Sequence, residues 1–590
     1  MEYFSDLLTR EMEQAFERAG YDGALGKVTV SNRPDLCEYQ CNGAMAGAKQ
    51  YHKAPFMIAE DVAAQLKDSA VFSSAEAVKP GFLNLKVSEG LIQKYVGEMA
   101  EDPRFGSPLP EHPKTVILDY GGPNIAKPLH VGHLRSAVIG ESIKRIVKWH
   151  GDRAIGDIHL GDWGLQMGLV ITELKKRQPD LVYFDPDYTG EYPEEAPFTV
   201  SELEEIYPFA SGRSKEDPEY YKEALENTHL LQEGNRGYRA LWNKIVAVST
   251  ADMKRNYERL NVSFDLWYGE ASVHDRIPGM VKDLKEKGYA YESDGALIVD
   301  VAEETDAKEV PPCMILKSDG ASLYTTTDLA TILQREEDFA PDEIIYITDK
   351  RQELHFIQVF RCARKCGLIR PETELRHIGF GTVNGKDGHA LKTRDGGVMR
   401  LETLLDDIDA AMLEKIRSNE EIGEEEADRT AKQVGLAAVK YGDLSNQASK
   451  DYIFDMDRFT SFEGDTGPYL LYTIVRIRSI LQKYAAAGQG KDASQCRICA
   501  PGDEAEKALM LDLCGFSQMM DDAYRDLAPN RICAFIYRVA NDFNSFYHGT
   551  KILTEPDEAK KEGYIALLSL CERMLSACID VLGFSAPARM

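Results

Sequence analysis

Residues 115–149 constrain the fold more than any other stretch of the chain. They begin with the apolar run 116–118, which predicts a short buried strand. A loop of turn-forming residues follows, and the apolar side chains after it recur at helical spacing. A strand that passes through a tight loop directly into a helix is typical of a parallel α/β sheet. Ligands of such sheets bind at the carboxyl ends of the strands, so this loop is a candidate ligand-binding site.

The loop ends in His130-Val131-Gly132-His133, at the point where the predicted helix begins. Unpaired backbone N–H groups and the helix dipole favour phosphate at a helix start. Gly132 has no side chain, so an adenine ring could lie against its backbone. The two imidazoles could donate hydrogen bonds to a phosphoryl group, and Lys127 adds a point charge. The pattern therefore predicts a nucleotide site, and the alternative is a helix start with two ordinary surface histidines.

Five segments in this order carry a resemblance to a known family: PNIAKPLHVGHLRS (123–136), IHLGDWGLQMG (158–168), DKRQELHF (349–356), SFEGDTGPYLLYTIVRIRSIL (461–481) and LGFSAPARM (582–590). The first resembles the HIGH signature of class I aminoacyl-tRNA synthetases, and the set resembles arginyl-tRNA synthetases. The resemblance implies ATP-dependent ligation of L-arginine to tRNA(Arg) through an arginyl-adenylate, with release of AMP and diphosphate. It also implies catalytic roles for His130, Gly132, His133 and Lys127.

Class I enzymes carry a second phosphate clamp, the KMSKS loop, and the matching stretch here is 390–394. The resemblance implies that Lys392, Thr393 and Arg394 bind ATP in a closing loop. Thr393 stands where the second lysine of the pattern belongs, and Lys127 matches a compensating lysine that many arginyl enzymes carry just before HIGH. The alternative is a solvated basic loop without a role in catalysis.

Recognition of arginine needs a carboxylate for the planar guanidinium. Tyr324 and Asp328 are four residues apart, so they share one face if the segment is helical. The resemblance implies that both bind arginine, together with Asp119, Asn124 and Gln352. Asp119 is a shorter acid than the family usually has at the end of the first strand. Without the resemblance, Tyr324 and Asp328 would be an ordinary surface pair.

Recognition of tRNA is expected in the C-terminal part of the chain. Tyr469, Tyr472 and Arg476 have the spacing of one helical face, and aromatic and arginine side chains together can stack unpaired bases. The resemblance implies that this face contacts the anticodon and that Met590 packs there. The alternative is that the tyrosines are half-buried core residues.

The alternation of strands and helices predicts a multidomain α/β and α protein, with strand candidates at 115–119, 153–157, 296–301 and 343–348. We expect an N-terminal α+β domain that binds the tRNA elbow (1–110), a Rossmann-like parallel-sheet catalytic domain (111–400) with an insertion at about 175–290, a connecting helical segment (401–455) and a helical anticodon-binding domain (456–590). Within the insertion, the acidic stretch 178–220 carries no evident chemistry.

The composition of the chain limits which nucleic-acid, metal and membrane partners we expect. A net charge of −28 argues against a protein that coats nucleic acid non-specifically, and any tRNA contact must use a local basic or stacking face. The 11 cysteines are scattered, with one C-x-x-C at 496–499, so we expect free thiols, no zinc and a cytoplasmic protein. We expect Mg²⁺ with ATP, no membrane span, and a monomer. The alternative functions are another class I synthetase and a non-catalytic tRNA-binding paralogue.

Overall fold

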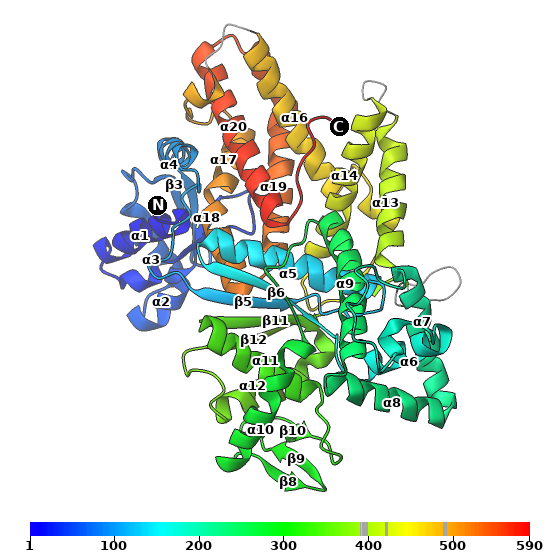
Figure 1. Cartoon of the computed structure of the whole chain (residues 1–590). Helices are drawn as coiled ribbons and strands as arrows, with labels where there is room; N and C mark the ends of the chain where they lie inside the picture. Colours follow the sequence, from blue (N-terminus) through cyan, green and yellow to red (C-terminus); the bar gives the residue numbers. More distant parts are fainter. Residues whose placement is uncertain (390, 392–398, 419–422, 488–491) are drawn as a thin grey trace. The chain divides into compact units, whose positions relative to one another are not determined.

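The computed structural model describes residues 1–389, 391, 399–418, 423–487 and 492–590 (Figure 1). The described chain packs as two compact units. The first comprises Glu111–Thr460 and Leu582–Phe584, and the second comprises Met1–Pro110, Ser461–Val581 and Ser585–Met590. We call them the sheet unit and the bundle unit. Among the described residues, no helix has the length and apolar character needed to cross a membrane.

A parallel sheet of five strands, in the order β12-β11-β5-β6-β7, forms the centre of the sheet unit. Its strands are β5 (Thr115–Tyr120), β6 (Arg153–Leu160), β7 (Leu266–Gly269), β11 (Glu343–Asp349) and β12 (Glu374–Phe380). The register places Asp119 opposite both Asp157 and Tyr346, so the carboxyl ends of three strands meet at one edge. The predicted Rossmann-like sheet is confirmed, and residues that follow these strands share that edge.

One predicted strand belongs to a different sheet. Residues 296–301 were expected in the parallel sheet, but β9 (Ala296–Val299) pairs antiparallel with β8 (Tyr291–Ser293) and β10 (Cys313–Leu316). The reason is the tight turn between β8 and β9, where Asp294 and Gly295 both have positive φ. Such a turn returns the chain beside the strand it has just left, which a parallel crossover cannot do.

Helices cover both faces of the parallel sheet. Figure 1 shows α5 (Val131–His150) along one face and α11 (Tyr324–Phe339) and α12 (Glu353–Lys365) on the other. The other helices of this unit are α6 (Leu165–Arg177), α7 (Val200–Glu216), α8 (Pro218–Gln232), α9 (Arg236–Arg259), α10 (Ile277–Glu286), α13 (Leu401–Ile416), α14 (Glu424–Leu444) and α15 (Met456–Phe459), with short 3₁₀ turns η2 (Val182–Phe184), η3 (Glu270–Arg276) and η4 (Lys350–Gln352) and the strand pair β13 (Val383–Asn384) and β14 (Tyr452–Ile453).

Two predicted boundaries differ from this packing. The expected insertion, 175–290, contains β7, which is a strand of the central sheet and extends it beyond β6. The expected connecting segment, 401–455, packs within the sheet unit through α13 and α14. Both boundaries follow from tertiary pairing, which local periodicity does not report.

Buried polar contacts fix α5 to its surroundings. Arg135 is 1% exposed, and it pairs with Asp443 at 3.0 Å and donates to the carbonyls of Gly381 and Lys450, both at 2.9 Å. Ser136 accepts a hydrogen bond from the Gly121 N–H and donates one to the Ile347 carbonyl of β11. The first turns of α5 are therefore tied to two strands and to α14.

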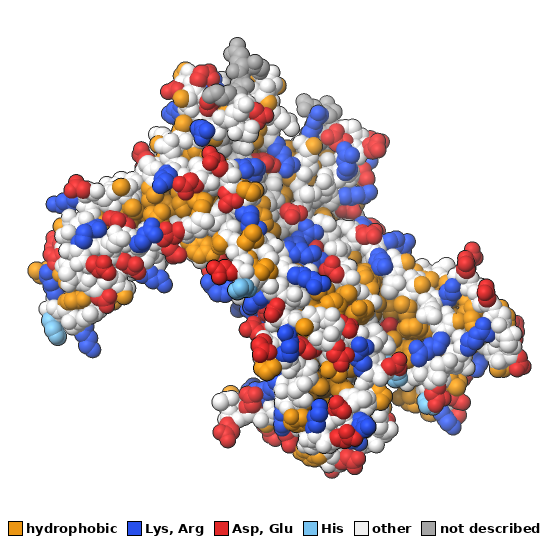
Figure 2. All heavy atoms as spheres, turned by 60° about the vertical axis from the view of Figure 1, so that its left-hand side comes forward, with side chains coloured by type: hydrophobic (Ala, Val, Ile, Leu, Met, Phe, Trp, Pro, Cys, Tyr) orange, Lys and Arg blue, Asp and Glu red, His pale blue; other side chains and the backbone are white. Residues whose placement is uncertain are grey.

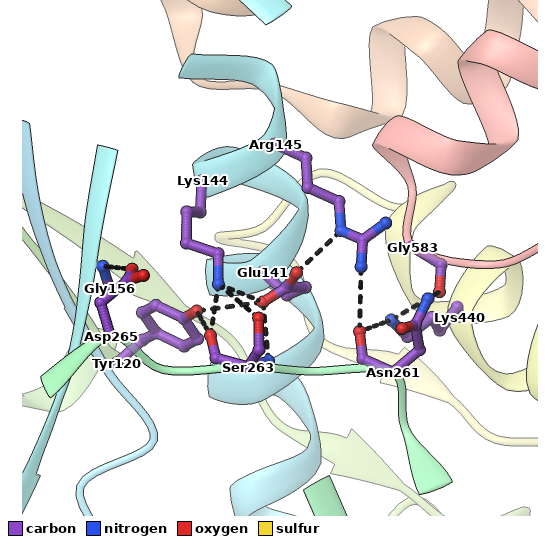
Figure 3. A network of polar contacts seen from close by, with 10 residues as sticks. All are labelled: Tyr120, Glu141, Lys144, Arg145, Gly156, Asn261, Ser263, Asp265, Lys440 and Gly583. Carbon is purple, nitrogen blue, oxygen red and sulfur yellow. Dashed lines mark hydrogen bonds and ion pairs between the residues drawn. The ribbon is translucent and has the colours of Figure 1, made fainter. Parts of the chain in front are cut away.

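Further along α5, a polar network reaches the segment Leu582–Phe584 (Figure 3). Glu141 accepts from Lys144 at 2.8 Å and from Arg145 at 2.7 Å, and Arg145 donates to the Asn261 carbonyl at 3.3 Å. The Gly583 carbonyl accepts from Asn261 at 3.0 Å and from Lys440 at 2.9 Å. Gly583 has a φ of +86°, which favours glycine, and a Cβ there would lie 2.4 Å from the Lys440 Nζ and displace that ammonium.

The bundle unit combines a four-stranded antiparallel sheet with a helical bundle. The sheet has the order β1-β2-β4-β3, from β1 (Val28–Val30), β2 (Tyr39–Cys41), β3 (Phe72–Val78) and β4 (Phe82–Val87). Its helices are α1 (Phe4–Arg18), α2 (Gly43–Tyr51), α3 (Pro55–Ala64), α4 (Glu89–Glu101), α16 (Gly467–Ala486), α17 (Glu504–Cys514), α18 (Phe516–Asp526), α19 (Pro529–Gly549) and α20 (Glu558–Val581), with short 3₁₀ turns η1 (Gly23–Leu25), η5 (Ala493–Gln495) and η6 (Ile552–Thr554).

Within the bundle unit, the residues of the antiparallel-sheet region (1–110) contact the helices of the C-terminal bundle. Lys507 of α17 forms an ion pair with Glu38, and Phe105 packs edge-on against Phe516 of α18 with ring centroids 5.2 Å apart. Residues 1–110 and 461–581 therefore pack into one unit, although the 350 residues 111–460 separate them in the sequence. On the face in Figure 2, Lys and Arg side chains lie among Asp and Glu side chains.

Candidate active site

Two imidazoles lie together at the start of α5, as the sequence suggested. The His130 Nδ1 accepts a hydrogen bond from the Gly132 N–H at 3.0 Å, and the His133 Nδ1 accepts one from the His130 N–H at 3.1 Å. A neutral imidazole that accepts at Nδ1 carries its proton on Nε2. Both rings, whose centroids are 4.0 Å apart, therefore present an Nε2–H donor beyond the helix start.

The two rings are neutral near pH 7. Burial, with smaller contributions from His130 and Lys127, lowers the pKa of His133 to about 3. Burial also lowers the pKa of His130, with a second contribution from Lys127. Gly132 allows this arrangement because a Cβ there would lie 2.7 Å from the His130 ring. The site therefore offers uncharged donors that stabilise negative charge as it develops on a phosphoryl group.

Lys127 stands beside the histidines on a fixed backbone. The preceding residue, Ala126, has a φ of +61°, and its N–H donates to the Ser249 hydroxyl at 3.1 Å. The Lys127 Nζ lies 4.5 Å from the centre of the Tyr207 ring, which belongs to α7. The predicted ATP-binding residues Lys392, Thr393 and Arg394 lie outside the described residues, so their role stays a prediction.

The predicted arginine-binding pair lies at the start of α11. Tyr324 is its first residue and is 73% exposed, and Asp328 follows one turn later. The Asp328 carboxylate contacts the His355 Nε2 at 2.6 Å, which fixes its orientation. The helical spacing of the pair is thus present, and both side chains are available to a ligand.

A second carboxylate stands near Asp328. Glu270 follows β7 directly, at the carboxyl end of that strand. Burial, with smaller contributions from the negative charges of Asp162 and Asp328, raises the pKa of Glu270 to about 8. Glu270 and Asp328 in turn raise the pKa of Tyr324, after burial. Two acids and a phenol therefore lie close enough to shift one another's pKa, and a cation bound near them would relieve the repulsion of the acids.

Asp119 has an internal partner. The Arg335 guanidinium, which is completely buried, bridges Asp119 at 2.6 Å and Asp157 at 2.5 Å. A buried guanidinium needs both carboxylates to offset its lost hydration. The predicted role of Asp119 in binding free arginine stays untested, and the contact that the structure shows for this carboxylate is structural.

The remaining predicted arginine ligands lie at strand ends. Asn124 forms a bridge with Gly161, where a Cβ would lie 2.1 Å from the Asn124 Oδ1. Gln352 ends η4, directly after β11, and its side chain is exposed. Both follow strands of the parallel sheet, and their ligand roles stay predictions.

The family of the chain is identified by comparison with protein-family models. Residues 99–456 match the family described as "tRNA synthetases class I (R), catalytic domain". The chain belongs to the class I arginyl-tRNA synthetases. The arginyl tRNA synthetase N terminal domain matches residues 5–87, and the DALR anticodon binding domain matches residues 470–590.

Curated arginyl-tRNA synthetases resemble the chain over its full length. The arginine–tRNA ligase of Agathobacter rectalis is 61% identical over 100% of both chains, and that of Alkaliphilus oremlandii is 52% identical over 100% of both. Among solved structures, the arginyl-tRNA synthetases of Plasmodium falciparum and Thermus thermophilus have TM-scores of 0.81 and 0.76, each with 22% identity and full coverage of both chains. These two structures support the fold.

The predicted tRNA face of this synthetase divides into two kinds of residue. Tyr469 is half-buried, and its hydroxyl donates to Asn541 at 2.7 Å and accepts from Asn544 at 2.9 Å. Tyr472 is 41% exposed, and the Arg476 guanidinium lies 4.7 Å from its ring centre. The single face therefore holds a packed tyrosine, an exposed tyrosine and a half-buried arginine, which also donates to Asn544 at 2.6 Å.

Arg476 also lies 5.1 Å from the Tyr547 ring of α19, so two aromatic rings flank it. Met590 is half-buried at the last described position. Its predicted contact with tRNA stays a prediction. Tyr547 was absent from the sequence-based set because it comes from a different helix.

Sequence reasoning about the synthetase site missed Glu270, His355 and Tyr207. Glu270 had a signal, because an acid at the end of a parallel strand is a ligand candidate, but β7 lay inside the expected insertion. His355 lies in the DKRQELHF segment without having been assigned a role. Tyr207 had no signal. In the described part of the chain, no group of three or more His, Cys, Asp and Glu residues is arranged to hold a metal ion.

Proposed function

We propose that the chain ligates L-arginine to tRNA(Arg) at this site, using ATP and passing through an arginyl-adenylate. The observation that carries the proposal is that one unit holds an acid pair suited to a guanidinium, Glu270 after β7 and Asp328 on α11, and a pair of neutral imidazole donors at the start of α5. The first suits arginine, and the second suits the phosphoryl group that arginine must attack.

The first step needs no covalent nucleophile from the protein. The substrate carboxylate attacks the α-phosphate of ATP, a P–O bond forms, and diphosphate leaves with the electrons of the bond that breaks. Negative charge spreads over the phosphoryl oxygens in the transition state. The Nε2–H groups of His130 and His133 donate to these oxygens, and the Lys127 ammonium approaches from the same end of the site.

Arginine is held by its side chain. We assign the guanidinium to Asp328 and Glu270, since two carboxylates match its planar set of donors, and Tyr324 supplies a flat neighbour. Asn124 and Gln352 are proposed to bind the α-amino and carboxylate ends of the substrate. Asp119 is proposed to act through Arg335, which holds β5, β6 and α11 in register beneath the site.

In the second step, a hydroxyl of the tRNA 3′ end attacks the carbonyl carbon of the adenylate and AMP leaves. We propose that Tyr472 and Arg476 hold the anticodon region, supported by the exposed Tyr472 ring and the Arg476 guanidinium 4.7 Å from its centre. The residues around Lys392, Thr393 and Arg394 are proposed to close over ATP, and residues 1–110 to bind the tRNA elbow.

The remaining partners follow from the chemistry. We propose that Mg²⁺ enters with ATP, bound by its phosphate oxygens, and that no zinc takes part. The eleven cysteines form no disulfide, which supports a reducing, cytoplasmic setting. A monomer suffices, because the proposed arginine, ATP and tRNA contacts all come from one chain.

ATP–diphosphate exchange against the twenty amino acids, with and without tRNA(Arg), tests the proposal. Of the twenty amino acids, only arginine should support exchange, and labelled arginine should then transfer to tRNA(Arg). Exchange with a different amino acid would indicate another class I specificity. Loss of all exchange, together with retained tRNA binding, would indicate a non-catalytic paralogue.

A further inference from the structure

The acidic stretch 178–220 is not free of chemistry, because one of its helices reaches the nucleotide end of the site. α7 presents Tyr207 and Glu204, which are three residues apart and therefore on one helical face. Tyr207 contacts Lys127 of the loop that carries the two histidines, and Glu204 contacts that loop through Arg400. The other residues of α7 include exposed charges such as Glu205, as expected of a solvated helix.

Tyr207 contacts Lys127. The Lys127 ammonium lies 4.5 Å from the ring centre, within the range of a cation–π interaction. Both side chains are half-buried, so the contact is partly shielded from water. Ala126 and Ser249 fix the backbone before Lys127, whereas the Tyr207 ring restricts the long side chain itself. A lysine has four rotatable bonds, and an aromatic face that holds its end removes most of their freedom.

Glu204 contacts the other side of the histidine loop through Arg400. The two side chains pair at 2.8 Å, and the Glu204 side chain is only 8% exposed. Arg400 forms an antiparallel bridge with His130. The neighbouring backbone groups pair as well, because the Val131 N–H donates to Met399 and the Leu401 N–H donates to Leu129. α7 thus supports the histidine loop from a second direction.

We propose that Tyr207 is a positioning residue for adenylate formation, which holds the Lys127 ammonium toward the phosphates, and that Glu204 supports the same loop through Arg400. The proposal rests on the role of Lys127 given above. α7 would then line the nucleotide site and position one of its functional groups. Tyr207 touches no reacting atom, so its effect passes through Lys127.

A purely structural role for Tyr207 predicts different behaviour. Its ring also packs beside a small apolar cluster that includes Leu169, Ala210 and Tyr220. If packing alone mattered, leucine would substitute adequately for tyrosine and the loss would not depend on Lys127. Tyr207→Leu keeps an apolar side chain and removes the aromatic face, whereas Tyr207→Phe keeps the face and removes only the hydroxyl.

The test is rapid-quench measurement of adenylate formation by the full chain with arginine, ATP and tRNA(Arg), in a double-mutant cycle. Tyr207→Leu should slow the step roughly 2- to 30-fold, the range for loss of one cation–π contact. The KM for ATP should change less than the rate, and Tyr207→Phe should retain most of the rate. In a Lys127→Met background, Tyr207→Leu should cause no further loss.

The proposal is overturned if Tyr207→Leu forms adenylate at the wild-type rate, or if its loss multiplies with that of Lys127→Met. If Lys127→Met alone has no effect, the proposed role of Lys127 fails instead, and the two failures are thus distinguishable. Should Tyr207→Leu not fold, as judged by its melting temperature, Glu204→Gln provides a second route. It should slow the step severalfold, and Glu205→Gln on the same helix, at a side chain 71% exposed, should not. Equal rates in these two variants would overturn the role of Glu204.

Discussion

The two ends of the proposed active site use opposite electrostatics. The arginine end collects acids, with Glu270 and Asp328 near one another and His355 against Asp328. The ATP end uses neutral imidazoles, whose ionisation burial and Lys127 suppress. A permanent cation is best bound by acids that are already in place and are ionised in the complex, whereas charge that develops during reaction is best met by fixed dipoles. The contrast separates binding of the amino acid from acceleration of the chemical step.

The largest expected effect is at the arginine end. Asp328→Asn keeps the shape of the side chain and removes its charge, which leaves a bound guanidinium with one carboxylate. Loss of such a partner costs about 3–5 kcal/mol, or roughly 150- to 5,000-fold in kcat/KM for arginine. The KM for ATP should change little. Asp338→Asn, at an exposed position of the same helix, is the control. Arginine binding within a few-fold of wild type would remove Asp328 from the site.

At the ATP end, Lys127→Met should lower the rate of adenylate formation roughly 10²- to 10³-fold, the size of losing one fixed donor. Arginine affinity should stay near its wild-type value, in contrast to Asp328→Asn. Thr393→Lys, which restores the usual residue of the second clamp, should recover part of the rate. Lys148→Met, an exposed lysine of α5, serves as the control. An unchanged chemical step in Lys127→Met would end its catalytic assignment.

Substitutions in the predicted tRNA face should have a smaller effect, which lowers arginine activation as a whole rather than at one end of the active site. Tyr472→Ala should weaken tRNA binding about 5- to 150-fold, because one stacked base contributes roughly 1–3 kcal/mol. Exchange should fall at limiting tRNA and recover at saturating tRNA. Tyr469→Ala should instead lower the melting temperature, since its hydroxyl bonds Asn541 and Asn544. Tyr221→Ala, with the same 41% exposure, is the control. The expected loss of exchange rests on the hypothesis that tRNA docking helps to assemble the ATP site, and full exchange by the wild type without tRNA would contradict that hypothesis.

The smallest effect is a pH dependence confined to the arginine end. Glu270, with its pKa raised to about 8, is mostly protonated at pH 7, and only its ionised form attracts a guanidinium. Arginine affinity should therefore rise about fivefold from pH 7 to pH 8, with proton release on binding. Titration calorimetry in two buffers measures both, and Glu270→Gln should abolish both. The affinity for ATP should not follow this curve, because the histidines stay neutral throughout the interval.

How far the sequence predicts this molecule depends on how local each feature is. β5, the loop and α5 were predictable, because periodicity and turn residues fix them within 35 residues, 115–149. Tyr324 and Asp328 share a helix face for the same reason. Asp119 was harder, since its partner Arg335 lies 216 residues away. Tyr207 and Glu270 reach the site through crossovers whose packing no local pattern reports.

The Gly583 contact bears on the order in which the protein can be built. The sheet unit includes Leu582–Phe584, whose Leu582 and Phe584 side chains are almost completely buried. All strands of the parallel sheet and residues 461–581 are translated before residues 582–584. Until then Lys440 lacks the Gly583 carbonyl, and the far half of α5 lacks the end of its polar network. The packing of the sheet unit is thus completed by a segment that follows residues 461–581 in the chain, so its final packing step comes after synthesis of the bundle helices.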